Sequence, residues 1–223
     1  MTENSKPNYQ KELDTILAGL AGEYGHAPGT KQSLLLHACC APCSSYVLEY
    51  LAPYFDVTVY YYNPNIYPPE EYSRRLGELK KFLPVFPPAE QNSVRFVEAL
   101  YVPQEFDSAL RISESPELAE ELERGERCRR CYLLRMKKAY EYAENAGFNW
   151  FTTTLSISPF KDARKINEIG KALETADGPK FLTSDFKKKS GFLRSLELSS
   201  EYGLYRQQYC GCRYSMQNTR HDS

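Results

Sequence analysis

The sequence contains no long apolar stretch. Among its 223 residues, no run approaches the roughly 20 apolar residues of a membrane-spanning helix. The N-terminal residues also lack the apolar core of a secretory signal peptide. We therefore expect a cytoplasmic protein without a membrane partner. The composition is 42% hydrophobic and 26% charged, which suits a globular protein with a substantial core.

Net charge, repeats and low-complexity segments are nearly or wholly absent as well. A formal charge of −1 at pH 7 creates no global field, so nucleic-acid binding would require a local basic patch. Without internal repeats, the chain is expected to form one α/β domain over residues 31–215. Residues 1–30 would be a partly flexible extension, and residues 216–223 a flexible tail.

Apolar and β-branched segments alternate with helical patterns along the chain. The strands are expected at 33–38, 56–62, 94–100, 150–155 and, in a short piece, 180–182. The helices are expected at 9–21, 43–52, 70–82, 132–146, 162–176 and 185–201, with another helix start at Pro116. This alternation predicts an α/β fold with a parallel sheet flanked by helices. A helical insert near 103–135 would carry a C-x-x-C pair.

Seven cysteines fall into three clusters, and none of them stands alone. They are Cys39, Cys40 and Cys43, then Cys128 and Cys131, then Cys210 and Cys212. The first cluster ends an apolar strand, and Pro42 suits the first turn of the following helix. Ligands of open α/β sheets gather at such strand-to-helix junctions. In a reducing compartment this pattern indicates metal or redox chemistry, and we expect one site assembled from all three clusters.

Core packing, a thioredoxin-like pair and structural zinc fit the seven cysteines less well. Core packing accounts for single free cysteines but not for adjacent thiols joined by a C-x-x-C and a C-x-C. A thioredoxin-like pair should follow a strand, whereas Cys128 follows a charged helical stretch. Structural zinc commonly uses two C-x-x-C pairs, and the chain has one. An iron–sulfur cluster usually takes four cysteines, which leaves three for a second metal, redox or substrate. We expect His37 to be a core residue or a neighbour of the ligands.

Basic residues gather in the same segments. Lys187, Lys188, Lys189 and Arg194 lie in or near the helix expected at 185–201, and Arg206 precedes the last cysteine pair. A solvated helix face is the usual reason for such a run. Tyrosines beside these cations also fit phosphate contacts and base stacking in an RNA complex. Both interpretations stay open at this point.

Several specific motifs occur in a fixed order. They are His37-Ala-Cys-Cys-Ala-Pro-Cys43, Tyr62-Asn-Pro-Asn-Ile66, Cys128-x-x-Cys131, Thr153-Thr-Leu-Ser-Ile-Ser-Pro159, Asp185-Phe-Lys-Lys188 and Tyr205-Arg-Gln-Gln-Tyr-Cys-Gly-Cys212. Together they resemble the QueH-type epoxyqueuosine reductases, the cobalamin-independent enzymes of queuosine synthesis, over residues 33–215.

The resemblance implies a Rossmann-like (HUP-like) core and reduction of epoxyqueuosine to queuosine at the wobble position of tRNA, the last step of queuosine synthesis. It further implies a 4Fe-4S cluster with an adjacent second metal ion, iron or zinc. A low-potential donor such as ferredoxin or flavodoxin would supply electrons to a monomeric enzyme. The family often has Asp where this chain has Cys43, a softer ligand.

The expected roles of individual residues follow from this resemblance. The cluster ligands are expected among Cys39, Cys40, Cys128, Cys131 and Cys210, with all seven thiols available to the metals. The proposed proton donors are Asp185 and Tyr209. The proposed substrate-binding residues are Lys187, Lys188, Lys189, Arg194 and Arg206.

Two other functions remain as alternatives. One is an iron–sulfur enzyme that transfers sulfur to tRNA, which would normally need a glycine-rich ATP-binding loop where Cys39 to Cys43 stand. The other is a zinc-stabilised RNA-binding module without catalysis. Such a module would be colourless and would contain stoichiometric zinc.

Overall fold

A five-stranded parallel sheet forms the centre of the protein. The computed structural model describes residues 7–24 and 31–219. The strands are β1 (Gln32–His37), β2 (Phe55–Tyr61), β3 (Arg95–Glu98), β4 (Trp150–Thr153) and β5 (Lys180–Phe181). Their order is β3-β2-β1-β4-β5, and each neighbouring pair is parallel. The chain thus runs outward on one side of β1 and returns on the other, which confirms the expected Rossmann-like class.

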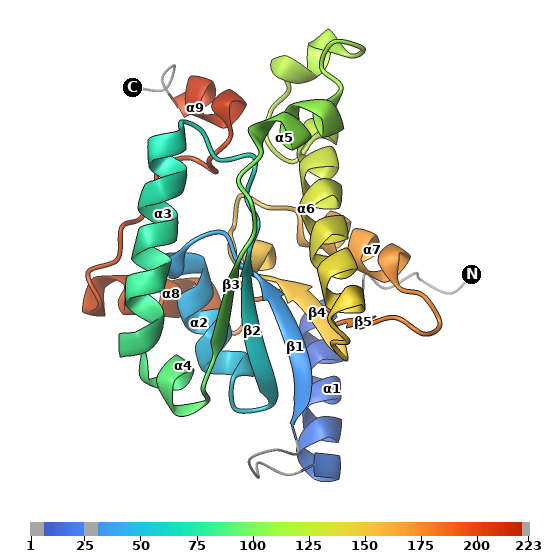
Figure 1. The fold of residues 1–223 in the computed structure, drawn as a ribbon, viewed down its shortest axis with the longest axis vertical. Coiled ribbons are helices and arrows are strands. Elements are labelled where there is room, and N and C mark those ends of the chain that lie inside the picture. The colour runs from blue at the N-terminus through green and yellow to red at the C-terminus, as the bar shows by residue number, and fades with distance from the viewer. Residues whose placement is uncertain (1–6, 25–30, 220–223) are drawn as a thin grey trace.

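Helices surround the sheet (Figure 1). They are α1 (Tyr9–Tyr24), α2 (Ala41–Leu51), α3 (Pro69–Phe82), α4 (Pro87–Gln91), α5 (Pro103–Leu110), α6 (Glu126–Asn145), α7 (Ala163–Leu173), α8 (Gly191–Glu201) and α9 (Arg213–Thr219). Short 3-10 helices occur at η1 (Leu83–Val85), η2 (Pro116–Ala119) and η3 (Thr154–Ile157). In the described part of the chain, none of the helices has the length and apolar character needed to cross a membrane.

The two faces of the sheet bury separate apolar clusters. Leu34 and Leu36 of β1 pack with leucines and aromatics of α1, α2 and α3. Leu35 points the other way and packs with residues of α6 and α7. This follows from the alternation of side chains along a strand. Both faces of a parallel sheet are covered in this way, which explains why β1 is an uninterrupted apolar run.

The start of α6 differs from the sequence-based expectation. The helix begins at Glu126 instead of Tyr132, so Cys128 and Cys131 lie in its first turns. No side chain of the N-cap residue caps it. Instead the Glu121 carboxylate accepts hydrogen bonds from the backbone N–H groups of Glu126 and Arg127, both at 2.7 Å. The helix expected to start at Pro116 is only the single turn η2.

The start of α8 was also predicted wrongly. Residues 185–190 form turns, and the helix begins at Gly191. Lys189 and Ser190 have φ values of 51° and 60°, so a right-handed helix cannot extend back through them. Three short helices, α4, α5 and α9, were not predicted. Residues 213–219 form α9 where a polar tail was expected from about 216, and residues 1–6, 25–30 and 220–223 lie outside the described residues.

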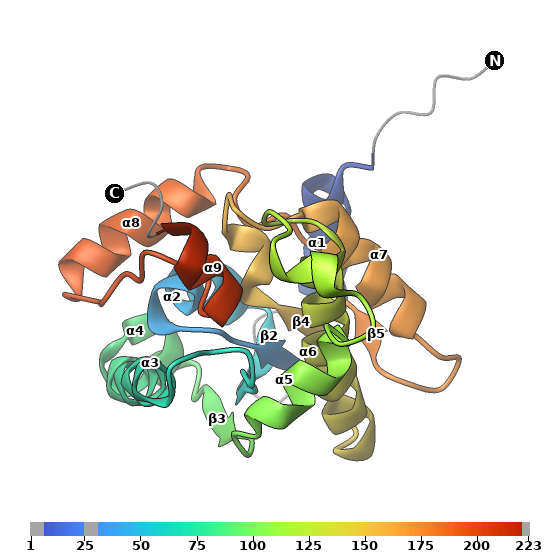
Figure 2. The same cartoon turned by 90° about the horizontal axis from the view of Figure 1, so that it is seen from above.

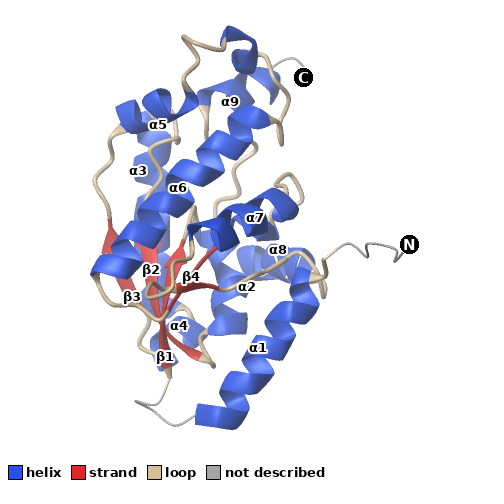
Figure 3. Cartoon of the chain, turned by 90° about the vertical axis from the view of Figure 1, so that its right-hand side faces the viewer, coloured by secondary structure: helices blue, strands red, loops and turns tan. Residues whose placement is uncertain are grey.

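Helices gather beyond the carboxyl ends of the strands. Figure 3 shows α5 and α9 at one end of the molecule, with α1 toward the other end. Seen from above, α9 lies between α3 and α6 (Figure 2). Arg213 of α9 binds Asp107 of α5 at 3.2 Å, and Tyr214 stacks under the Arg127 guanidinium of α6 at 5.1 Å. The C-terminal segment is thereby held against the end of the sheet where ligands of such folds bind.

Candidate metal centre

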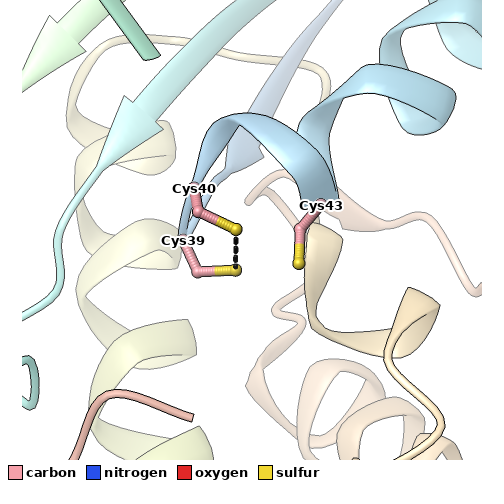
Figure 4. A group of neighbouring side chains, drawn as sticks. All are labelled: Cys39, Cys40 and Cys43. Atoms are coloured by element: carbon pink, nitrogen blue, oxygen red, sulfur yellow. Dashed lines mark hydrogen bonds between the residues drawn. The ribbon is translucent and has the colours of Figure 1, made fainter. Parts of the chain in front are cut away.

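Three thiols converge where β1 passes into α2 (Figure 4). Cys39 and Cys40 lie between the two elements, and Cys43 lies in the first turn of α2. The Sγ atoms of Cys39 and Cys40 are 3.8 Å apart, and all three Sγ atoms lie within 4.8 Å of one another. Two thiolates on one tetrahedral zinc-like ion, with bonds of about 2.3 Å, are separated by about 3.8 Å. The trio can therefore hold one metal ion with further coordination positions open.

The trio binds a proton very unevenly. The pKa of the Cys39 thiol lies well below its usual range because Cys40 and Cys43 donate to its sulfur and the Arg135 guanidinium attracts the thiolate. The same contacts raise the pKa of Cys40 to about 12 and hold the pKa of Cys43 well above its usual range. One thiolate thus lies among two thiols. Binding of a metal cation would displace the remaining protons.

The other four thiols form a second group. Cys128 and Cys131 are one helical turn apart in α6, and Cys131, Cys210 and Cys212 pack around the same small apolar cluster below α5. The Sγ atoms of Cys210 and Cys212 are 3.6 Å apart. Gly211 between them has a φ of 115°, which a residue with a Cβ adopts only with strain. The expected role of this glycine in the C-x-C turn is confirmed.

A buried arginine fixes the segment that carries the second group. Arg75 of α3 is 1% exposed, and its Nε donates to Glu71 at 2.6 Å. Its Nη1 and Nη2 donate to the carbonyl oxygens of Cys210 and Tyr209 at 3.3 and 3.4 Å. The position of the last cysteine pair therefore depends on α3 as well as on α6.

One cavity joins the two thiol groups. It has a volume of about 260 Å³, and its lining includes Cys39, Cys43, Cys210, Ile157, Phe192 and Gln207. The lining comes from the β1–α2 junction, η3 and the loop after it, α8 and the loop before α9. The structure therefore brings the first and third cysteine clusters to one cavity, and Cys131 packs directly beside the third.

The charged lining of the cavity is mainly basic. Arg135, Lys161 and Arg206 line it together with a single carboxylate, Glu123. Neither Arg135 nor Lys161 was predicted to be a site residue. The only sequence signal for Arg135 is its position four residues after Cys131, on the same face of a helix. Gln207 was also missed, and its Nε2 donates to the Cys40 sulfur at 3.3 Å.

His37 is a core residue, as expected. Its Nδ1 lies 2.8 Å from the Thr153 hydroxyl, and its Nε2 lies 3.1 Å from the Tyr62 carbonyl oxygen. A carbonyl only accepts, so Nε2 carries the proton and Nδ1 accepts from Thr153. Burial and the nearby Arg135 lower the pKa of His37 to about 3. With both ring nitrogens engaged, His37 orients the end of β1 and has no nitrogen free for a metal.

The predicted substrate-binding residues are distributed over two places. Arg206 lines the cavity, and its Nη1 donates to the Ser199 hydroxyl at 3.0 Å. The other basic residues do not line it. Lys187 pairs with Asp185 at 2.5 Å and Lys189 with Asp14 at 2.7 Å. Arg194 pairs with Glu49 at 2.8 Å and Glu197 at 3.1 Å, while Lys188 is exposed.

The two predicted proton donors also lie in different places. Tyr209 lines the cavity, and its hydroxyl donates to the Tyr67 carbonyl oxygen at 2.5 Å. Burial raises the pKa of Tyr209 to about 12. Asp185 lies outside the cavity lining and borders a separate surface depression beside α1. The role of each residue stays a prediction.

Comparisons with known proteins give one consistent result. A family model described as epoxyqueuosine reductase QueH matches residues 34–218. Among relatives named Epoxyqueuosine reductase QueH, the protein of Streptococcus pyogenes is 41% identical over 95% of this chain and 81% of its own length. The Haemophilus influenzae protein is 38% identical over 96% and 84%. The Thermotoga maritima protein is 33% identical over 84% and 92%.

Proposed function

Because the chain belongs to the QueH family of epoxyqueuosine reductases, we propose that it reduces epoxyqueuosine to queuosine at the wobble position of tRNA. It is an oxidoreductase, and the matches do not favour sulfur transfer or a zinc-stabilised binding module. The observation that supports this function best is the placement of seven thiols around one cavity at the carboxyl end of the sheet.

The donor set fits the cofactors that the family resemblance implies. We propose that Cys39, Cys40 and Cys43 hold the second metal ion, iron or zinc, because their sulfur atoms are spaced for one ion. The remaining cysteines, Cys128, Cys131, Cys210 and Cys212, match the four thiolates that a 4Fe-4S cluster usually takes. This division assigns Cys39 and Cys40 differently from the set expected from the sequence. When bound, the two centres would supply single electrons and a Lewis acid for the epoxide oxygen.

The protein residues of the cavity would bind and orient the substrate. Removal of the epoxide oxygen as water consumes two electrons and two protons. The Tyr209 hydroxyl is protonated at neutral pH because its pKa is raised, so it can donate one proton at the cavity wall. Asp185 is a weaker candidate because it pairs with Lys187 outside the lining. Arg206 and Gln207 offer donors that can hold the oxygen atoms of the substrate.

Binding of tRNA would use the surface around the cavity mouth. Phe160 lies on the lining and is 64% exposed, so its ring can stack on a base. Lys187, Lys188 and Lys189 would contact phosphates nearby, and Arg194 would first have to leave Glu49 and Glu197. We further propose a cytoplasmic monomer that takes its electrons from a ferredoxin or a flavodoxin.

The decisive test is conversion of the modified nucleoside. Anaerobically reconstituted protein is incubated with tRNA bearing epoxyqueuosine and a strong reductant, and the digested tRNA is analysed by mass spectrometry. We expect queuosine from the wild-type protein and none from tRNA incubated with reductant alone. Failure of wild-type protein with a full complement of iron and sulfide would refute the assignment.

A further inference from the structure

Two buried arginines near the thiols have no anionic partner. Arg127 is 2% exposed, and its Nη1 donates to the carbonyl oxygens of Leu118 and Ala119 at 2.6 and 2.9 Å. Its Nε and Nη2 have no hydrogen-bond partner among the described residues. Arg135 is 3% exposed, and its Nη2 donates to Asn63 at 2.5 Å, while its Nε is likewise unpartnered in the described structure.

Lys161 is the third cation of this region. It lines the cavity with Cys210 and Glu123. Its ammonium group forms no hydrogen bond or ion pair with any residue that the structure describes; only its backbone N–H is bonded, to Ser158 at 3.1 Å. Arg127 and Arg135 also form no ion pair within residues 7–24 and 31–219. Glu123 is the one carboxylate on the described cavity wall, so the three cations outnumber it.

The distribution of these cations follows the second thiol group. Arg127 directly precedes Cys128, and Arg135 lies one turn after Cys131 on the same helix. Cys210 is the strongest of the anionic groups that act on the Lys161 charge. Burial of a cation away from water is unfavourable unless an anion balances it. Cations placed at three sides of four thiols therefore require more negative charge than the protein groups alone supply.

We propose that Arg127, Arg135 and Lys161 form a cationic cage that raises the reduction potential of the metal–sulfur group bound by Cys128, Cys131, Cys210 and Cys212. The inference rests on the proposed function, which supplies that group. Reduction adds one electron from an external donor to the group and breaks no bond. Fixed positive charge in a region of low dielectric stabilises the more negative, reduced state, so the potential rises. The cage thereby brings the group within reach of a low-potential electron donor.

The test measures the potential instead of turnover. Lys161→Gln removes one charge of the cage without breaking a side-chain hydrogen bond. Arg164→Gln is the matched control, because Arg164 is 75% exposed and pairs with Glu168 on α7. Reconstituted proteins are titrated with dithionite or titanium(III) citrate, and the reduced state is followed by electron paramagnetic resonance. We expect Lys161→Gln to weaken reduction at least tenfold, which is a fall of about 59 mV for one electron. Arg164→Gln should leave the potential unchanged.

A charge-preserving variant separates charge from packing. Lys161→Arg should keep both the iron content and the potential of the wild type. If Lys161→Gln loses its iron while Lys161→Arg retains it, charge is the difference and the cationic cage is supported. Loss in both variants, or a full cluster with an unmoved potential in Lys161→Gln, overturns it. Wild-type protein that takes up no iron and sulfide would instead overturn the proposed cofactor, and the cage with it.

Discussion

Arg75 gives the sharpest test of how the C-terminal thiols are held in place. It is 1% exposed and connects Glu71 of α3 to the carbonyl oxygens of Tyr209 and Cys210. In Arg75→Met the Glu71 carboxylate, 9% exposed, keeps only the hydroxyl of Tyr205 at 3.3 Å. Removal of one partner from a buried ion pair costs about 3–5 kcal/mol of stability. We expect the lower end, about 3 kcal/mol, because Glu71 retains this one donor.

The double variant Arg75→Met/Glu71→Met isolates the cause. Apolar residues of similar volume in place of a buried ion pair are often neutral or stabilising. The double variant should therefore recover most of the free energy of unfolding that Arg75→Met loses. The measurement is urea unfolding of the metal-free proteins under reducing conditions, followed by circular dichroism. A loss below about 1 kcal/mol in the single variant, or no recovery in the double variant, would refute the reasoning.

Both variants lack the two bonds to the loop, so we expect the thiols of Cys210 and Cys212 to react faster with an alkylating reagent in each. Stability and loop position are thus separate results. Protection of both thiols at the wild-type level would show that α6 and α9 hold the loop without Arg75.

Four further predictions concern the cofactors and the substrate. Cys131→Ala should abolish the broad visible absorption of the anaerobic protein together with turnover, and a full-intensity spectrum would remove Cys131 from the ligands. Cys43→Ala should keep that spectrum and tRNA binding but lose epoxide reduction, so normal turnover would show that its thiol is dispensable. Glutamine at 187–189 should weaken tRNA binding and flatten its salt dependence without changing the spectrum, and an unchanged slope in a binding titration would contradict phosphate contacts. Phe160→Ala should weaken tRNA binding about tenfold, since a stacked base contributes about 1–3 kcal/mol, whereas Leu193→Ala, 57% exposed and outside the cavity lining, should not.

The parts of the fold that could be predicted are those written in local patterns. The apolar run of β1 and the aromatic run of β2 identify strands because their side chains are buried on both faces. The start of α6 could not be predicted, since its cap is the carboxylate of Glu121, five residues earlier, in place of a residue at the N-cap. The start of α8 depends on positive φ values at Lys189 and Ser190, which no residue type there signals.

The site shows the same boundary between local and long-range information. The spacing of the cysteines indicated one metal site, because unusual ligands clustered along the chain. Their division into three and four could not be predicted, because it depends on contacts between residues far apart in sequence, such as Cys131 and Cys212. Arg135 and Lys161 carry no motif that marks them as site residues. Their importance arises only when folding buries them beside thiols without a carboxylate partner among the described residues.

The crossing of the C-terminal segment to the carboxyl end of the sheet has a consequence for biosynthesis. The trio of Cys39, Cys40 and Cys43 is translated early, whereas Cys210 and Cys212 leave the ribosome only after every strand of the sheet. Domains begin to fold from the N-terminus during synthesis. The early thiols can therefore meet a metal ion before the second group exists, and the complete site closes only when the last loop docks on Arg75. Delivery of a preassembled cluster would fit this order best as the final step of maturation.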